Sequence, residues 1–330
     1  MKYLIPKKSR RMPRAGVRGG VDAVHHVVSR VCGREFLLRD GEKEAFRDLL
    51  RRVAGFCGVE VITYALLDNH FHVLVEVPGK AGELSDEALL ERARLLYGKE
   101  RKGQPLWMVR IEAALRAGGE VREAMRGLLM GRMASLPMFM KILKQRYSIQ
   151  FNRKYDRVGT LWEGRFRSVL VENSRVAVRA VAAYIDLNAV RAGLVDDPKD
   201  YRFCGYGEAV GSGKLRGYAL WQRIGESRGE SPEVIAARYR TYLYVTASDP
   251  RKGRSLKAED VAAVKAQGGA LSAGQLLRCR LRYMTQGAII GSKAFVERWM
   301  GDRAGESSGK RPPKAADGLG GEALFSASAR

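Results

Sequence analysis

The chain is poor in histidine, in clustered cysteine and in long apolar runs, and each shortage argues against a class of protein. Its 330 residues include only four histidines and four cysteines. The cysteines lie far apart, without a paired spacing, as is typical of reduced thiols in a cytosolic protein. These residues are Cys32, Cys57, Cys204 and Cys279. No apolar run approaches membrane-spanning length, and the first twenty residues are basic without the apolar segment of a signal peptide. We therefore expect a cytoplasmic protein with no membrane partner.

Acidic residues are also scarce relative to basic ones. The sequence has 36 Asp and Glu against 59 Lys and Arg, which gives a formal net charge of +23. An excess of this size points to a polyanionic partner, most often nucleic acid, and so to association with the nucleoid. The alternative is a basic protein that is merely soluble. An apolar share of 45% is enough to build a substantial core.

The apolar pattern predicts alternating strands and helices in the first part of the chain. Strands are expected at 21–31, 59–67 and 70–77, with a helix at 42–53 between the first two. Asp68-Asn69 forms a tight turn between the second and third strands. A fourth strand is expected at 165–172, followed by a helix that Ser174 caps and that runs to about Arg191, where Gly193 closes it. This order predicts an α+β fold, with a ferredoxin-like antiparallel sheet and helices on one face.

Composition divides the chain into five segments. We expect a basic N-terminal arm at 1–20, a main domain at 21–210 with a helical insertion at about 85–137, a linker and helix at 211–256, a C-terminal helical extension at 257–300 and a disordered tail at 301–330. Ser272 and Ser292 are candidate helix starts in the extension. The basic face of this extension suggests an added DNA-binding unit, although a packing element is the alternative.

Two of the four histidines flank one apolar residue in the third predicted strand. Side chains alternate across a strand, so His70 and His72 point to one face and Phe71 points to the other. Two imidazoles on one face can share one metal ion. Oxygen ligands from an amide or carboxylate, water and phosphate would suit Mg²⁺ or Mn²⁺, whereas zinc is disfavoured because no thiolate pair is at hand. The alternative is a pair of core histidines satisfied by hydrogen bonds.

A second group of candidate residues lies in the helix at 182–193. Tyr184 and Asn188 stand four residues apart and therefore share one helix face. Asn188 could complete the metal site, and Tyr184 could attack a phosphate held there, since a tyrosyl ester stores the energy of the broken bond. The alternative is an amphipathic helix whose tyrosine packs on the core. The rival nucleophiles are Tyr147, Tyr155 and Tyr201, of which Tyr155 ranks second.

Arginines alternate with aromatic residues between 155 and 168. Such a segment suits single-stranded nucleic acid, because cations meet the phosphates and rings stack on the bases. The candidate DNA-binding residues are Arg153, Lys154, Trp162, Arg165 and Arg167. The alternative is a surface hairpin with one buried tryptophan. The glycine-rich segment around Gly211–Lys214 is not a P-loop, because the preceding glycine spacing and the following Ser or Thr are both missing.

Three motifs in this order resemble the REP-associated tyrosine transposases, which belong to the insertion-sequence transposases with an HUH motif and one catalytic tyrosine. The motifs are Tyr64–Leu74, Gly159–Phe166 and Tyr184–Val195, and the resemblance extends over about 21–206. The family commonly has proline where this chain has Asp68 and Ala189, and neither difference removes a reactive group.

The resemblance implies a role for each candidate. His70 and His72 would be the metal ligands, Asn188 would assist the metal, and Tyr184 would be the nucleophile of a single-strand DNA endonuclease and strand transferase. This enzyme would form a 5′-phosphotyrosyl intermediate on hairpin-containing DNA and would act as a monomer or homodimer. Two other functions stay open: a domesticated, non-catalytic protein that binds DNA hairpins and regulates, and an RNA-binding protein.

Overall fold

The architecture was taken from a computed structural model of the chain. It describes residues 20–98, 106–211, 219–227, 229–247, 289–301, 314–316 and 324–327. The N-terminal arm, the Ser212–Lys214 segment and Ser272 lie outside these residues. Within these ranges, no helix combines the length and apolar character needed to cross a lipid bilayer.

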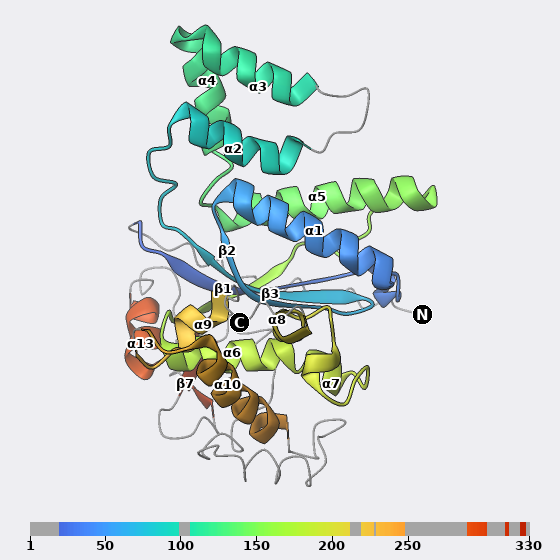
Figure 1. Cartoon of the computed structure of the whole chain (residues 1–330), viewed down its shortest axis with the longest axis vertical. Coiled ribbons are helices and arrows are strands. Elements are labelled where there is room, and N and C mark those ends of the chain that lie inside the picture. Colours follow the sequence, from blue (N-terminus) through green and yellow to red (C-terminus); the bar gives the residue numbers. More distant parts are fainter. Residues whose placement is uncertain are drawn as a thin grey trace, which may run out of the picture.

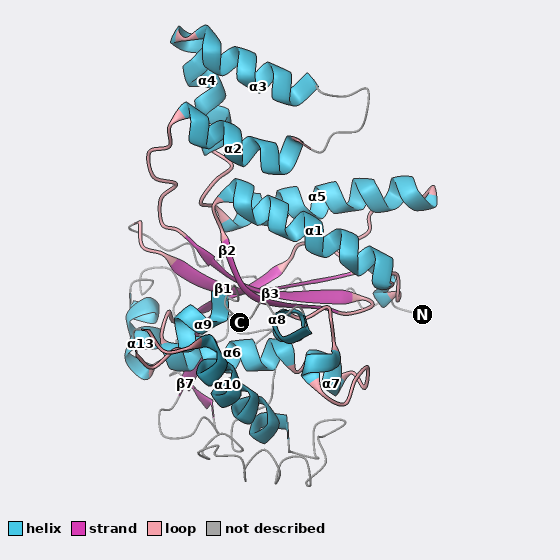
Figure 2. Ribbon diagram, viewed as in Figure 1, coloured by secondary structure: helices cyan, strands magenta, loops and turns pink. Residues whose placement is uncertain are grey.

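A mostly antiparallel sheet lies at the centre of the α+β fold (Figure 2). Its first four strands are β1 (Ala23–Arg30), β2 (Glu60–Leu66), β3 (His70–Val77) and β4 (Arg167–Val171). They are ordered β2-β3-β1-β4, and each neighbouring pair is antiparallel. All four strands were predicted from the sequence, because β-branched residues pack well on a pleated surface.

Alternation along β3 divides its side chains between two layers. Phe71 points toward helix α1 (Asp40–Cys57), where its ring lies 4.7 Å from that of Phe46. His72 points to the opposite face, where its ring lies 5.6 Å from that of Tyr184. The expected division of the strand into a histidine face and an apolar face is thereby confirmed.

Helices cover both faces of the sheet, so the expectation of helices on one face is wrong. Figure 1 shows α1 and α5 (Leu136–Tyr155) on one side, and α6 (Arg175–Asp186), α9 (Ala219–Ile224) and α10 (Pro232–Ala247) on the other. Side chains of both alternating sets of β3 are buried, the apolar set and also most of the set that carries the histidines, so both faces of the sheet are covered. Only the structure reveals which later helices cover the second face.

The predicted helical insertion forms a separate layer beyond α1 (Figure 1). It contains α2 (Asp86–Tyr97), α3 (Leu106–Ala117) and α4 (Gly119–Met130). Helix α2 begins at Ser85, whose hydroxyl accepts a hydrogen bond from the backbone N–H of Ala88 at 3.2 Å. The long helix α5 then returns the chain to α1.

Helix α6 follows β4 and carries the candidate nucleophile. Ser174 caps its first turn as predicted, since its hydroxyl accepts from the backbone N–H of Ala177 at 3.4 Å. The helix was expected to run to about Arg191. Instead it ends at Asp186, and a short helix α7 (Asn188–Arg191) continues after a break at Leu187.

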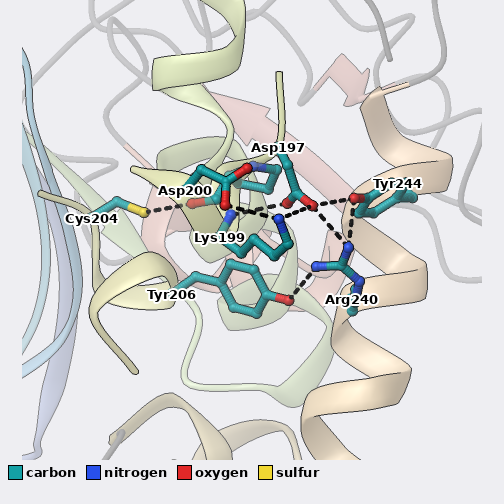
Figure 3. Close-up of polar contacts among 8 residues, drawn as sticks. Asp197, Lys199, Asp200, Cys204, Tyr206, Arg240 and Tyr244 are labelled. Carbon is teal, nitrogen blue, oxygen red and sulfur yellow. Dashed lines mark hydrogen bonds and ion pairs between the residues drawn. The ribbon is translucent and has the colours of Figure 1, made fainter. Parts of the chain in front are cut away.

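A polar network ties the segment after α7 to α10 (Figure 3). This segment includes a 3-10 turn (Pro198–Asp200) and helix α8 (Gly205–Gly211). Asp197 accepts hydrogen bonds from Tyr244 and from Arg240, the latter at 2.8 Å. Arg240 also donates to the hydroxyl of Tyr206 at 3.4 Å. These contacts hold α10 beside the chain that leaves the candidate site.

The C-terminal part adds strands where helices and disorder were expected. Strand β5 (Ile289–Gly291) pairs in parallel with β4 and is followed by β7 (Leu324–Ala327) and β6 (Lys314–Ala316), which complete a seven-stranded sheet within the described residues. Ser292 begins helix α13 (Lys293–Gly301) as predicted. Strand β5 pairs with the side of β4 that β1 leaves open, so the backbone groups of that edge are also hydrogen-bonded.

Candidate functional site

Three histidines and one tyrosine meet between β1, β3 and α6. The His72 ring lies 5.1 Å from the His70 ring, 5.2 Å from the His26 ring and 5.6 Å from the Tyr184 ring. Tyr184 also meets the edge of His26, with ring centroids 5.8 Å apart. The structure therefore brings together the two predicted metal ligands and the predicted nucleophile, which lie in distant parts of the sequence.

His26 is the residue that sequence reasoning missed. It stands opposite Leu74 in the β1–β3 register, and opposed residues share one face of the sheet. His26 therefore points with His72 toward α6, while its neighbour His25 points toward α1. The signal was present, because adjacent histidines in a predicted strand must place one imidazole on each face.

Asn69 fixes the orientation of the His70 ring. Its side-chain nitrogen donates to the backbone carbonyl of Arg34 at 3.1 Å, which directs its oxygen to Nδ1 of His70 at 2.6 Å. An amide oxygen can only accept a hydrogen bond, so Nδ1 of His70 carries the proton. The Nε2 atom of neutral His70 is consequently left with its lone pair, which is the state that a metal ligand needs.

Burial and nearby cations keep His70 and His72 neutral. Desolvation, reinforced by Arg30, lowers the pKa of His70 to about 4. The pKa of His72 is also lowered well below its usual range, first by burial and then by the other histidines and by Arg30 and Arg191. Neutral imidazoles at physiological pH can act as ligands or as hydrogen-bond partners.

Tyr184 is a buried phenol close to positive charge. Only 7% of it is exposed, and desolvation raises its pKa, while Arg191 and Arg30 act in the opposite direction. The Arg191 guanidinium lies 5.0 Å from the centre of the phenol ring and donates to the backbone carbonyl of Tyr184 at 3.0 Å. The two arginines give the site a positive potential that suits a phosphate group.

The donor set fits a divalent cation with an incomplete protein shell. His70 and His72 offer imidazole nitrogens on one face, but among the described residues no group of three or more His, Cys, Asp or Glu side chains is arranged to hold a metal ion. Asn188 uses its side-chain nitrogen to donate to the carbonyls of Tyr184 and Ile185, at 2.9 and 3.3 Å. Its oxygen is the atom suited to a cation, and its role as a ligand stays a prediction. Water or phosphate oxygens would supply the other positions.

The three rival tyrosines lie elsewhere and have other partners. Tyr147 donates to the backbone carbonyl of Glu42 at 3.0 Å, and Tyr155 donates to the side chain of Glu42. Tyr201 donates to the backbone carbonyl of Leu66 at 2.5 Å. None of the three has a ring contact with a histidine within the described part of the chain, whereas Tyr184 has two.

The predicted DNA-binding residues fall into three environments. Trp162 is only 5% exposed and donates from its indole nitrogen to the carbonyl of Lys144, so burial argues against its predicted role in base stacking. Arg153 and Lys154 lie on α5, across the sheet from Tyr184, and Lys154 is paired with Glu42 at 2.5 Å. Arg165 and Arg167 are exposed. Arg167 stands opposite Val28, which in turn stands opposite His72, so only Arg167 shares a strand face with the histidines.

Comparisons with known proteins add two distant structural likenesses. No protein-family model and no curated protein matches the chain. One solved structure is a REP-associated tyrosine transposase bound to a REP hairpin, with 14% identity and a TM-score of 0.38 over 61% of this chain and 87% of that one. Another is described as a "putative transposase" from Deinococcus radiodurans R1, with 12% identity and a TM-score of 0.24 over 48% of this chain and 85% of that one. TM-scores this low establish neither a shared fold nor a shared function, so the function has to be argued from the side chains of the site.

Proposed function

We propose that the protein is a metal-dependent single-strand DNA endonuclease and strand transferase that acts on hairpin-containing DNA, a transposase of the HUH type with a tyrosine nucleophile. One observation carries the proposal: the ring of Tyr184 on α6 lies 5.6 Å from the ring of His72 on β3, within the reach of a shared phosphate group. The strand order β2-β3-β1-β4 supports the ferredoxin-like arrangement that we propose for the main sheet.

The proposed reaction exchanges one phosphodiester for another. The phenol oxygen of Tyr184 attacks phosphorus and forms a 5′-phosphotyrosyl bond, while the bond from phosphorus to the 3′ oxygen breaks. The phenol proton ends on the released 3′-hydroxyl, so atoms and charges balance. A 3′-hydroxyl from the same or another strand can reverse the step and join the ends. The exchange is nearly isoenergetic and needs no nucleotide cofactor.

Each group in the site has a part in this exchange. Mg²⁺ or Mn²⁺ held by His70, His72 and Asn188 would withdraw charge from the scissile phosphate. Arg191 holds the phenol ring in place through its contacts with the ring and the Tyr184 carbonyl. Arg30 and Arg191 stabilise the phenolate of Tyr184 relative to the neutral phenol. Their positive charge would also attract the phosphate group. Arg165 and Arg167 are proposed to hold the strand where it leaves the site.

A covalent-adduct assay tests the nucleophile. The protein is incubated with Mn²⁺ and a labelled single-stranded oligonucleotide that contains a hairpin, and the adduct is resolved on a denaturing gel. We expect Tyr184→Phe to lose the adduct and to retain DNA binding, because only the reactive oxygen is removed. Tyr155→Phe, the matched control, should keep the adduct. An adduct that survives in Tyr184→Phe and disappears in Tyr155→Phe would reverse the assignment.

One observation favours the second candidate, a non-catalytic protein that binds DNA hairpins. Burial raises the pKa of Tyr184, and a buried protonated phenol is a poor nucleophile until it loses its proton. This function predicts a gel shift with hairpin DNA that is unaffected by a chelator, with no covalent adduct in the wild-type protein. An RNA of the same sequence, used as a competitor, separates an RNA-binding protein from both.

A further inference from the structure

His26 makes a buried polar contact with His72, one of the two predicted metal ligands. Its Nε2 atom lies 2.9 Å from Nδ1 of His72, and the two rings are stacked with 21° between their planes. His26 is completely buried, and it also contacts the Tyr184 ring edge-on. The imidazole of His26 therefore has little freedom to reorient, because it is packed between the predicted ligand His72 and the predicted nucleophile Tyr184.

We propose that His26 is a positioning residue for the cation site: it accepts the Nδ1 proton of His72 and thereby directs the Nε2 lone pair of His72 to the metal. The proposal deepens the function proposed above and rests on the same cation site. It assigns to His26 the part that Asn69 plays for His70 on the neighbouring ring.

Proton counting supports this assignment. A neutral imidazole carries one N–H, so a hydrogen bond between His26 and His72 leaves two arrangements. If His26 donates, Nε2 of His72 must carry its own proton and cannot bind a cation. If His26 accepts, Nε2 of His72 is a lone pair beside the lone pair that Asn69 fixes on His70. Only the second arrangement presents two ligand atoms on one face, as a divalent cation requires.

The neighbouring histidine provides a matched control. His25 is 5% exposed, comparably buried to His26, but it stands opposite Val75 and Leu170, on the face of the sheet that points away from His72. Replacing it removes a buried imidazole from the same strand without touching His72. Any effect specific to His26→Leu therefore arises from its face of the sheet and not from loss of a core histidine.

The first measurement is Mn²⁺ affinity of the full-length protein by titration calorimetry. We expect His26→Leu to bind Mn²⁺ about 10- to 100-fold more weakly, the usual effect of removing such a supporting hydrogen bond. His26→Gln keeps an acceptor oxygen and should bind close to wild type, as should His25→Leu. Equal affinity of folded His26→Leu and wild type, or no Mn²⁺ binding by wild type, would overturn the proposal. If His26→Leu does not fold, the second measurement decides, because it uses the unmodified protein.

The second measurement is the tautomer of His72 in metal-free, ¹⁵N-histidine-labelled wild-type protein by nuclear magnetic resonance. We expect the proton of His72 on Nδ1, whereas a proton on Nε2 would overturn the proposal. This readout involves neither DNA nor cleavage. A protein that forms no DNA adduct but shows the Nδ1 tautomer and the Mn²⁺ loss in His26→Leu would refute the proposed nuclease function while leaving the role of His26 intact.

Discussion

Two adjacent histidines on β1 have opposite surroundings because a strand turns successive side chains to opposite faces. His26 meets His72 and Tyr184, whereas His25 is buried on the other face of the sheet, opposite Val75 and Leu170. Burial lowers the pKa of His25 from its ordinary 6.5 to about 4. The same residue type thus contributes to the candidate site at one position and to pH-dependent stability at the next.

His25 should make the folded state sensitive to mild acid. Above pH 6.5 it is neutral in both states. Between pH 6.5 and about 4, the His25 imidazole is protonated in the unfolded chain but stays neutral in the folded chain. The free energy of unfolding therefore decreases as the pH falls through this range. We expect His25→Leu to remove up to about 3 kcal/mol of that decrease. Urea unfolding from about pH 7 to about pH 4.5 measures it, and parallel stability curves for variant and wild type would contradict the prediction.

The sequence indicated which residue types a segment contains, but not which of their side chains are buried and which are exposed. Arg165 and Trp162 occupy one segment, and both were expected to hold DNA. The indole packs with the rings of Phe71 and Tyr147, at 5.4 and 5.9 Å, while Arg165 stays exposed. An aromatic residue among arginines serves stacking or packing equally well, and only the neighbours supplied by distant elements decide between them.

At the scale of elements, α6 is held on the sheet by a buried carboxylate. Asp186, two residues after Tyr184, is fully buried. It accepts hydrogen bonds from the hydroxyl of Thr63 on β2 at 2.8 Å and from the hydroxyl of Tyr239 on α10 at 2.7 Å. One buried carboxyl group therefore joins three elements and fixes how far along the sheet Tyr184 stands.

Removing either hydrogen-bond donor to Asp186 should weaken the attachment of α6 to its neighbouring elements. We expect Tyr239→Phe and Thr63→Val each to lower the free energy of unfolding by about 2 kcal/mol, because a hydrogen bond to a buried charge is lost while the packed volume is kept. The double variant should lose less stability than the sum of the two single losses, because both donors bond to the same carboxyl group of Asp186. Chemical denaturation of the four proteins checks this, and single variants within about 0.5 kcal/mol of wild type would contradict it.

Strand and helix positions were largely predictable, whereas layers were not. The third predicted strand, 70–77, coincides with β3, and Ser174 caps α6 as expected. These features depend on local patterns of apolar residues and on one capping side chain. The addition of β5 to β4 depends instead on residues that are far apart in the sequence, for which the local pattern holds no signal.

At the scale of the whole molecule, the net charge of +23 predicts salt-sensitive binding of DNA. The charge alone does not say which face the strand occupies. Arg167 and Arg153 are both exposed, but Arg167 shares a strand face with His72, and Arg153 lies on α5 across the sheet. The two arginines are therefore a matched pair for locating the DNA.

We expect Arg167→Ala to weaken binding of single-stranded hairpin DNA and to reduce the slope of log affinity against log salt by about 0.7, the contribution of one phosphate contact. Arg153→Ala should leave both quantities unchanged. Fluorescence anisotropy over a series of salt concentrations measures the slopes. A reduced slope in Arg153→Ala and an unchanged slope in Arg167→Ala would place the strand on the α5 side instead.

By itself, the sequence determined that His70 and His72 share one face of β3 and that Phe71 points to the other, because alternation along a strand is a local property. Tertiary structure alone decided that His26 joins His72, that Tyr184 rather than Tyr155 faces the histidines, and that Trp162 is buried. These outcomes depend on strand register and on the docking of α6, which are set by packing between segments distant in the chain.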